Sequence, residues 1–288
     1  MSALRVARIP YLNSAPFYQQ LAGAGFELVD MPPRELGRLA SAGQVDAGIL
    51  SLCDLLRDPV FDELGKIGIS ADGPAHSVLL FTRGELSDLE GGTIAITGET
   101  STSFPLLRLL LETRHSISTD FARRPNGPQS EDVGHLLIGD AALRVAAAGG
   151  LVPGLADYSP DMIPLARPTE GDWTHVVDLG AAWKRWQGLP FVFARWAAAT
   201  HVPTADREDL QRRINESLDT SSLDLRRVAA TRAASAGLDD EAGRAYLEGF
   251  GYRLGSDEEA GQQRFIELLE ATDWWAHDER LAGVEIGT

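Results

Sequence analysis

The sequence predicts an α/β protein with two lobes, a cleft between the lobes and a helical C-terminal part. Short apolar runs alternate with amphipathic stretches through the first 80 residues. This order of strands and helices predicts a parallel sheet. A second α/β unit of the same kind begins near Thr93, after the polar, turn-rich stretch 83–92. From Pro203 onward, apolar residues recur at helical spacing in one segment after another, which predicts a series of helices.

The first unit is expected to contain five strands and three helices. Pro32 and Pro33 open one of the helices, because proline fits the first helical turn, where an amide has no partner. The expected strands are Leu4–Ile9, Phe26–Val29, Val45–Leu50, Lys66–Ser70 and His76–Thr82, and the expected helices are Ala15–Ala22, Arg34–Ala42 and Ser51–Arg57. Ligands of parallel sheets bind beyond the carboxyl ends of the strands. The loop after the first strand is therefore the first place where we expect a site.

The second unit repeats the alternation, and one further strand is expected to return the chain to the first lobe. The strands are Thr93–Thr97, Ser116–Phe121, Leu136–Gly139 and His175–Leu179, the helices are Thr102–Arg114, Asp140–Ala148 and Ala181–Gln187, and the returning strand is Phe191–Ala199. The C-terminal helices are Asp206–Leu218, Leu223–Ala236, Asp239–Gly249 and Asp257–Thr272. We therefore expect residues 1–83 and 198–288 to form the first lobe and residues 84–197 to form the second.

The net charge excludes some classes of partner. The chain carries 26 basic and 42 acidic side chains, a formal net charge of −16. Nucleic acids and anionic membrane surfaces are bound by basic faces, so the charge argues against both. A small anionic ligand stays open, because a pocket can be locally positive inside an acidic protein. No apolar run approaches the roughly 18 residues of a membrane span, and Met1–Pro10 has no signal-peptide pattern, so we expect an unprocessed cytoplasmic protein.

Motifs for common cofactors and metals are missing from the sequence. It has no glycine-rich dinucleotide loop, no phosphate loop with lysine, no His-Glu-x-x-His and no Gly-x-Ser-x-Gly. Cys53 is the single cysteine, and the six histidines lack the spacing of metal ligands. The sequence therefore predicts neither a cofactor nor a metal site.

A run of four hydroxyl residues marks one strand-to-helix junction. Thr100, Ser101, Thr102 and Ser103 follow Gly98 and Glu99. Free amides and the helix dipole attract an anion at such a junction, and hydroxyls add donors without adding charge. We therefore predict that these four residues bind substrate. The alternative is that they only cap the helix.

A second junction, Ile138–Leu143, is expected to close the other side of the pocket. Asp140 would cap its helix, with Ala141 beside it, and capping alone is the alternative role. A carboxylate pointing into the pocket would repel an anion, so we expect Asp140 to point at its own helix or to hold a hydroxyl. We include Asp140 and Ala141 among the candidate substrate-binding residues.

Three further residues are candidates at the cleft. Asn13 follows the first strand and offers both a donor and an acceptor, although it could be a simple turn asparagine between two prolines. Ser77 begins a strand that should line the same cleft, although it could be an ordinary strand serine. Phe191 belongs to an aromatic-rich segment that could wall the cleft, although core packing would explain the segment equally well.

Several segments taken together resemble the chorismate dehydratases of the futalosine route to menaquinone, whose fold is that of the type II periplasmic binding proteins. The similar segments, in chain order, are Ile-Pro-Tyr-Leu-Asn-Ser-Ala-Pro from Ile9, the Thr-Ser-Thr-Ser loop, Ile-Gly-Asp-Ala-Ala-Leu from Ile138, Val-Asp-Leu-Gly from Val177, Gly-Leu-Pro-Phe-Val-Phe-Ala-Arg-Trp from Gly188, and the stretch from Tyr246 to Gly255. Ser51 and Leu52 depart from the pattern, standing where that family has a proline-containing turn.

The resemblance implies loss of water from chorismate, a small dianion, to give 3-[(1-carboxyvinyl)oxy]benzoate. It implies no redox cofactor or metal. Hydroxyls and amides at Thr100–Ser103 would stabilise the negative charge that develops on the ring carboxylate. As a hypothesis, the enolpyruvyl carboxylate of the substrate takes the ring proton, Asn13 holds that side chain in a reactive pose, and Ser77 binds a carboxylate. Asn13 and Ser77 are therefore the candidate catalytic residues.

Two alternatives remain open. One is a non-enzymatic cytoplasmic binding protein for a small carboxylate, which the fold alone would favour. The other is the sister enzyme 1,4-dihydroxy-6-naphthoate synthase. That enzyme carries a Cys-Pro-Asn-Asp type of turn near its N-terminus, and this turn is absent here.

Overall fold

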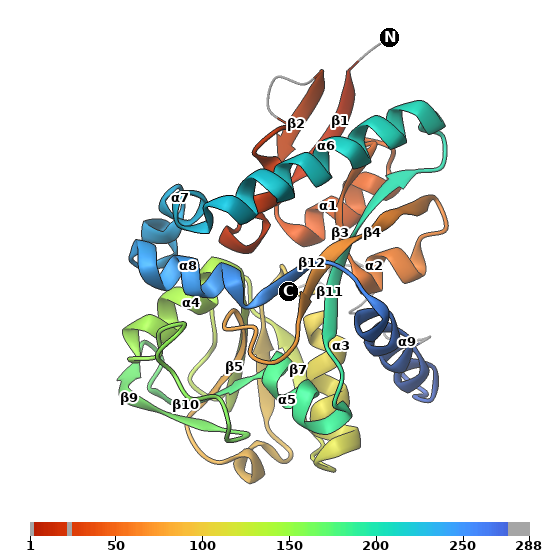
Figure 1. Ribbon diagram of the computed structural model, residues 1–288. Coiled ribbons are helices and arrows are strands. Elements are labelled where there is room, and N and C mark those ends of the chain that lie inside the picture. Colours follow the sequence, from red (N-terminus) through yellow and green to blue (C-terminus); the bar gives the residue numbers. More distant parts are fainter. Residues whose placement is uncertain (1–2, 22–24, 276–288) are drawn as a thin grey trace.

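The computed structural model describes residues 3–21 and 25–275 and contains two six-stranded sheets, one in each half of the molecule (Figure 1). The first sheet has the order β12-β4-β11-β3-β1-β2, and the second has the order β7-β6-β8-β5-β10-β9. The strands of the first sheet are β1 (Leu4–Arg8), β2 (Phe26–Asp30), β3 (Ala47–Ser51), β4 (Phe61–Ala71), β11 (Phe191–Ala199) and β12 (Phe250–Arg253). Those of the second are β5 (Val78–Thr82), β6 (Thr93–Ile96), β7 (Asp120–Arg123), β8 (Gly134–Ile138), β9 (Ile163–Thr169) and β10 (Trp173–Asp178).

Helices cover both sheets, and several of them come from the C-terminal part of the chain. The longer helices are α1 (Pro33–Ser41), α4 (Gly139–Ala148), α5 (Leu179–Gln187), α6 (Thr204–Leu223), α8 (Asp240–Glu248) and α9 (Ser256–Glu270). The shorter ones are η1 (Leu12–Tyr18), α2 (Leu52–Arg57), η2 (Leu86–Leu89), α3 (Ser103–Arg108), η3 (Leu109–Arg114), α7 (Leu225–Ala230) and η4 (Ala233–Ala236). α6 packs on η1 and β4, and α9 packs on β11 (Figure 1). None of the helices in the described ranges is long and apolar enough to cross a membrane.

The chain crosses between the sheets earlier than the predicted lobe boundaries. β5 pairs with β8 and β10 in the second sheet, so the first crossing is the segment 72–77 and does not follow residue 83. β11 lies between β3 and β4 in the first sheet, so the return is complete by Phe191 and does not wait for residue 198. Both strands are largely apolar, and an apolar run does not indicate which of the two sheets its strand will join. The boundaries therefore depended on long-range pairing.

Some predicted elements differ from those observed. The strand expected at Ser116–Phe121 lies at Asp120–Arg123, and the helix expected at Ala15–Ala22 is a 3-10 helix that already begins at Leu12 and includes Pro16. Ala22 lies outside the described residues. The helix expected at Leu223–Ala236 is interrupted, because the Asp224 carboxylate accepts a hydrogen bond from the Arg227 amide and starts a new helix.

Two edge strands were not predicted. β9 is mostly exposed and contains two prolines, so its sequence lacks the apolar alternation of a strand. β12 has only four residues, which follow α8 directly. Both lie at the edge of a sheet, where strands tolerate proline and short length.

α9 approaches the loop before β11 through Gly261. A Cβ atom built on Gly261 would lie 2.0 Å from the carbonyl oxygen of Pro190. Backbone atoms cannot yield as a flexible side chain can, so glycine is required for this close approach. Phe265, one turn further along α9, is fully buried with its ring centroid 4.9 Å from that of Phe191.

We expect Gly261→Ala to lower the free energy of unfolding by about 2 kcal/mol, because overpacking forces α9 away from β11. In an unconstrained helix the same change would stabilise by about 1 kcal/mol. Urea unfolding of the variant measures the difference. The control is Gln263→Ala on the exposed face of α9, which should stay within about 0.5 kcal/mol of the wild type. An unchanged or raised stability of Gly261→Ala would contradict the close approach.

Candidate active site

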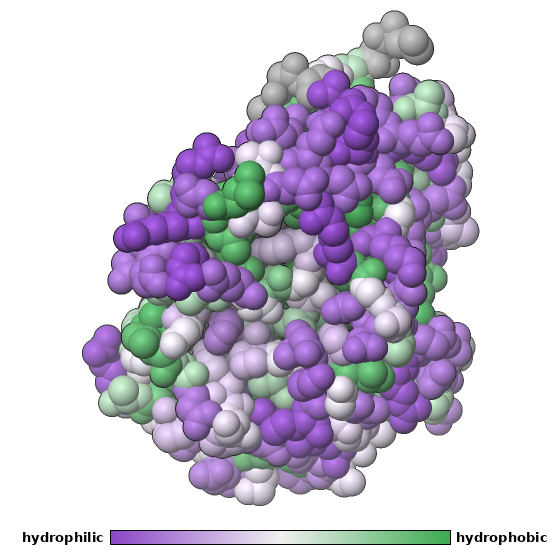
Figure 2. Space-filling view, viewed as in Figure 1, coloured by the Kyte–Doolittle hydropathy of each residue, from purple (hydrophilic) through white to green (hydrophobic). Residues whose placement is uncertain are grey.

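A cavity lies where the two sheets face each other, and residues from both halves of the molecule line it. It contains about 660 Å³ of space between protein atoms, a figure that includes open solvent at its mouth. The lining residues are Ile9, Tyr11, Asn13, Ser14, Ser51, Ile69, Ser77, Val78, Glu99, Ser101, Thr102, Ser103, Ile138, Gly139, Phe193, Ala194 and Phe250. Figure 2 shows strongly hydrophilic side chains over α6 and paler, less polar ones where the two halves meet.

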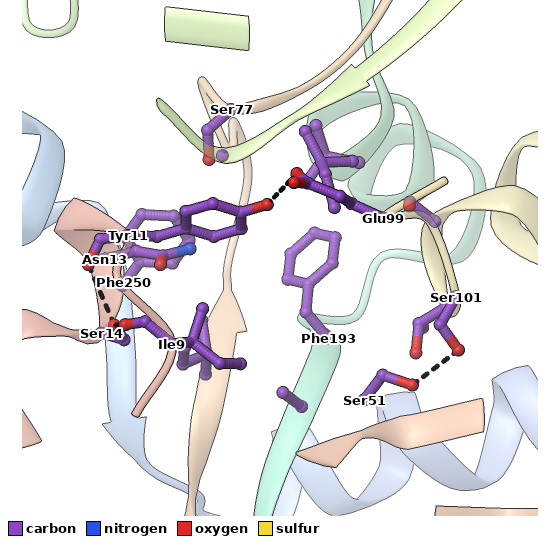
Figure 3. A pocket seen from close by; sticks show the side chains of 17 residues that line it. Ile9, Tyr11, Asn13, Ser14, Ser51, Ser77, Glu99, Ser101, Phe193 and Phe250 are labelled. Atoms are coloured by element: carbon purple, nitrogen blue, oxygen red, sulfur yellow. Dashed lines mark hydrogen bonds between the residues drawn. The ribbon is translucent and has the colours of Figure 1, made fainter. Parts of the chain in front are cut away.

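Tyr11 and Glu99 meet across the cavity. Tyr11 precedes η1 in the first half of the molecule, Glu99 follows β6 in the second, and the Tyr11 hydroxyl donates to the Glu99 carboxylate (Figure 3). Burial raises the pKa of Tyr11, and the neighbouring Glu99 raises it further. The Tyr11 hydroxyl therefore stays protonated and acts as a donor. Neither residue was among the sequence candidates, although Glu99 directly precedes the hydroxyl run.

The Tyr11 ring packs directly over the backbone of Gly139. This glycine has a φ of 61°, and a Cβ atom there would lie 2.7 Å from the ring. Both the left-handed backbone and the close ring require glycine. Gly139 thus sets how far Tyr11 reaches into the cavity.

Asn13 and Ser77, the two predicted catalytic residues, line the same cavity. The side chain of Asn13 is half-buried in the cavity beside Tyr11 (Figure 3) and makes no hydrogen bond with any residue in the described ranges. Its amide is therefore available to a ligand. Ser77 is buried, accepts a hydrogen bond from the Tyr246 hydroxyl at 2.7 Å and donates to the Ala75 carbonyl at 3.2 Å.

The hydroxyl run divides into three residues at the cavity and one away from it. Ser101, Thr102 and Ser103 line the cavity, whereas Thr100 is buried and its hydroxyl donates to the Thr97 carbonyl at 3.0 Å. Thr100 therefore does not line the cavity, and its role in substrate binding stays a prediction. Its hydroxyl closes a local turn instead.

Ser101 and Thr102 also join the two halves of the molecule at α2. Ser101 Oγ accepts from Ser51 Oγ at 2.8 Å and donates to Asp54 Oδ1 at 2.6 Å. Thr102 Oγ1 accepts from the Cys53 amide at 3.1 Å. α3 itself has no side-chain cap, so simple helix capping does not explain the run. The hydroxyls serve contacts between the two halves that flank the cavity.

Asp140 points across to the first half of the molecule and not at its own helix. Its Oδ1 accepts from the Leu12 amide at 2.9 Å, and α4 begins at Gly139, one residue before the expected cap. Burial raises the pKa of Asp140, while the Leu12 amide and the charges of Arg232 and Arg144 oppose that rise. The expectation that it would cap α4 or hold a hydroxyl was therefore wrong, because the partner is a backbone amide from a distant loop.

Ala141 and Phe191 do not line the cavity, whereas Gly139 and Phe193 do. Phe191 is fully buried against Trp183 and Phe265, so the core-packing alternative holds for it. β11 shifts register against β4 between Val192 and Ala194. Such a bulge breaks the alternation of faces along a strand, which is why the sequence pattern could not indicate that Phe193 faces the cavity.

The lining supplies neutral donors more than charge. Of the lining residues, none is lysine, arginine or histidine, and Glu99 is the one carboxylate. Arg232, which precedes η4, donates to the Pro10 carbonyl in the Tyr11 loop. In residues 3–21 and 25–275 there is no cluster of three or more histidine, cysteine, aspartate or glutamate side chains that could hold a metal ion. The polar groups of the lining are therefore mainly hydroxyls and the Asn13 amide, and several of the hydroxyls already donate to other protein groups.

The fold and the cavity define a two-lobed α/β protein with a small-molecule site between its sheets. Among solved structures, it is similar to protein AF1704 from Archaeoglobus fulgidus, with a TM-score of 0.70 at 19% identity over 93% of this chain and 97% of that one. It is also similar to the alkanesulfonate-binding protein SsuA from Xanthomonas axonopodis pv. citri, with a TM-score of 0.64 at 13% identity over 94% and 93% of the two chains. The predicted periplasmic-binding-protein-like fold is therefore confirmed.

The sequence comparisons assign the family. The profile of the menaquinone biosynthesis family matches residues 4–271, and the chain belongs to this family. The chain is also 33% identical over 264 residues to a chorismate dehydratase from Thermus thermophilus, covering 90% of this chain and 92% of that protein. The resemblance drawn from the sequence motifs is confirmed.

We expect Asp140→Ala to lower the free energy of unfolding by about 2 kcal/mol, because it leaves the buried Leu12 amide without an acceptor. Asp140→Asn keeps a carbonyl oxygen that can accept the same bond and should stay within about 0.5 kcal/mol of the wild type. Thermal or urea unfolding of the pair measures both values. Equal losses in the two variants would contradict the role of Asp140 as the acceptor of the Leu12 amide.

Proposed function

We propose that this protein is a chorismate dehydratase, a hydro-lyase that converts chorismate into 3-[(1-carboxyvinyl)oxy]benzoate and water in the futalosine route to menaquinone. The observation that carries the proposal is the similarity to a chorismate dehydratase along 90% of the chain. The cavity supports it, since its polar lining groups are mainly neutral donors suited to carboxylates. A biosynthetic role on a soluble metabolite fits a cytoplasmic protein.

The reaction removes a ring proton next to the enolpyruvyl ether and the neighbouring hydroxyl group. Electrons of the broken C–H bond first delocalise toward the ring carboxylate and then expel the hydroxyl as water, which leaves an aromatic ring. Donors aimed at the ring carboxylate lower the barrier, because negative charge grows there as the proton leaves. Ser77 is proposed for this role, because its hydroxyl hydrogen is engaged, among the described residues, only by the Ala75 carbonyl at 3.2 Å.

Asn13 is proposed to hold the enolpyruvyl side chain, so that the carboxylate of the substrate itself takes the ring proton. The same proton can then leave with the hydroxyl group as water, so no outside acid or base is consumed. The half-buried amide of Asn13 fits this task because it has no partner within the described residues. The apolar walls, Phe193, Phe250 and Ile69, limit water around the reacting carbons.

We expect purified protein to convert chorismate to a product lighter by one water, as followed by mass spectrometry. Asn13→Ala should slow turnover by about 100-fold or more, because a misplaced carboxylate loses the benefit of alignment. The control is Asn126→Ala, on an exposed turn away from the cavity. Full turnover by Asn13→Ala with only a raised KM would show that Asn13 binds without orienting the proton acceptor.

A binding protein is the second candidate, because the solved structures with this fold include sulfonate-binding proteins. Unchanged chorismate that raises the melting temperature would favour a carboxylate-binding protein or the sister naphthoate synthase. The absence of both turnover and stabilisation would exclude chorismate as the ligand.

Glu99 offers a protein alternative to the substrate carboxylate as proton acceptor, and Glu99→Gln separates the two. If the substrate carboxylate takes the proton, we expect the turnover rate to stay within about threefold of the wild type. KM should fall about fivefold, because one negative charge near a dianion is removed. Glu170→Gln, an equal charge change at an exposed loop between β9 and β10, should change neither value. Turnover slowed by about 100-fold or more in Glu99→Gln would instead assign the proton to Glu99.

A further inference from the structure

We infer that Tyr246 is a positioning residue for Ser77: its buried hydroxyl donates to Ser77 Oγ and leaves the Ser77 hydrogen directed at a carboxylate in the cavity. This inference deepens the proposed function and rests on it for the identity of the carboxylate. Tyr246 touches Ser77 and does not line the cavity itself.

Tyr246 lies directly behind the wall of the cavity. It is on α8, fully buried, and its hydroxyl lies 2.7 Å from Ser77 Oγ, although the two residues are 169 positions apart in the chain. Its ring centroid lies 5.1 Å from that of Phe250 in an edge-to-face arrangement, and Phe250 lines the cavity. α8 and β12 thus bring both residues of this aromatic pair to the site.

The hydrogen-bond count fixes the direction of donation. Ser77 Oγ is the one acceptor that the Tyr246 hydroxyl contacts within the described residues, so a phenol hydrogen aimed anywhere else would be buried without a partner. A serine hydroxyl has one hydrogen and two lone pairs. With one lone pair taken by Tyr246, the Ser77 hydrogen must point to another acceptor, and in this structure that acceptor is the Ala75 carbonyl.

The bond to Ala75 is the weak member of this chain of hydrogen bonds. At 3.2 Å it is longer than the usual ~2.5–3.0 Å of O–H···O bonds. A carboxylate forms shorter, charge-assisted bonds, so a substrate carboxylate should take the Ser77 hydrogen from Ala75. Donation from Tyr246 polarises the Ser77 hydroxyl and strengthens it as a donor.

Burial keeps Tyr246 in the donating form. Desolvation raises the pKa of Tyr246 well above its ordinary value, although the Ser77 hydroxyl opposes this rise. The phenol therefore keeps the hydrogen that it donates to Ser77 Oγ.

Tyr252 provides a matched control on β12. It packs on the same Phe250, with ring centroids 6.4 Å apart, and on Phe17. Its buried hydroxyl, however, has no hydrogen-bond partner in the described part of the chain. Removing this oxygen breaks no hydrogen bond, whereas removing the oxygen of Tyr246 leaves Ser77 without its donor.

The test compares Tyr246→Phe, Tyr252→Phe, Ser77→Ala and the double variant Ser77→Ala/Tyr246→Phe in the chorismate assay. We expect Tyr246→Phe to lower kcat about tenfold with little change in KM, because the charge on the ring carboxylate grows in the transition state. Tyr252→Phe should match the wild type. The double variant should match Ser77→Ala within about twofold, since Tyr246 acts only through Ser77.

Two kinetic results would overturn the inference while leaving the proposed function intact. One is equal activity of Tyr246→Phe and Tyr252→Phe. The other is a further tenfold loss when Tyr246→Phe is added to Ser77→Ala, which would give Tyr246 a role independent of the serine. Melting temperatures of all four variants separate these effects from loss of fold.

A second experiment follows the Tyr246 hydroxyl by NMR in protein that retains Tyr246. It tests the inference even if Tyr246→Phe does not fold or the wild type does not consume chorismate. The chain has five tyrosines, so their Cζ signals can be assigned in ¹³C-labelled protein. With benzoate as the carboxylate probe, the Tyr246 signal should move in the wild type and stay in place in Ser77→Ala. Binding of benzoate without this movement, or no binding at all, would overturn the inference.

Discussion

The buried carboxylate of Asp178 fixes the place where the chain passes from the first sheet to the second. Its oxygens accept from the amides of Ala75 at 3.0 Å, His76 at 2.7 Å and Ala181 at 2.9 Å. One side chain thereby caps α5 and holds the crossing segment, in which His76 adopts a left-handed φ of 58°. Burial raises the pKa of Asp178, while His76 and the three amides oppose that rise. Ser77 follows at once, so its position in the cavity depends on this carboxylate.

The two halves of the molecule meet through hydrogen bonds that surround the cavity. Tyr11 reaches Glu99, the Leu12 amide reaches Asp140, and the hydroxyls of the Ser101 loop reach the start of α2. Each bond joins one sheet's loops to those of the other, so the shape of the cavity depends on how closely the halves approach. A small change at any of these contacts should alter the site, because packed interfaces rearrange between discrete states.

The lining of the cavity offers dipoles more than formal charge. Its lining has hydroxyls, an amide and aromatic rings, and its one carboxylate is held by Tyr11. In the proposed reaction of a dianion, this arrangement would avoid over-stabilising the ground state and would leave the hydrogen bond from Ser77 to strengthen as charge develops. Tyr246 lies one residue behind the wall of the cavity and contributes another dipole through its hydrogen bond to Ser77. Its burial keeps the Tyr246 hydroxyl directed at Ser77.

The sequence by itself determined the alternation of strands and helices, the two-lobed fold class and the family, because periodicity and motif order are local properties of the chain. The sequence also indicated Asn13, Ser77 and the hydroxyl run as candidate site residues. Asn13, Ser77 and three residues of that run line one cavity in the structure. Only the tertiary structure decided that Thr100 faces away, that Asp140 serves Leu12, and that Phe193 replaces Phe191 at the wall. Those outcomes depend on sheet register, a bulge in β11 and contacts such as Tyr11–Glu99 and Tyr246–Ser77, which join residues 88 and 169 positions apart. No local pattern encodes such separations, because they arise only when distant elements pack together.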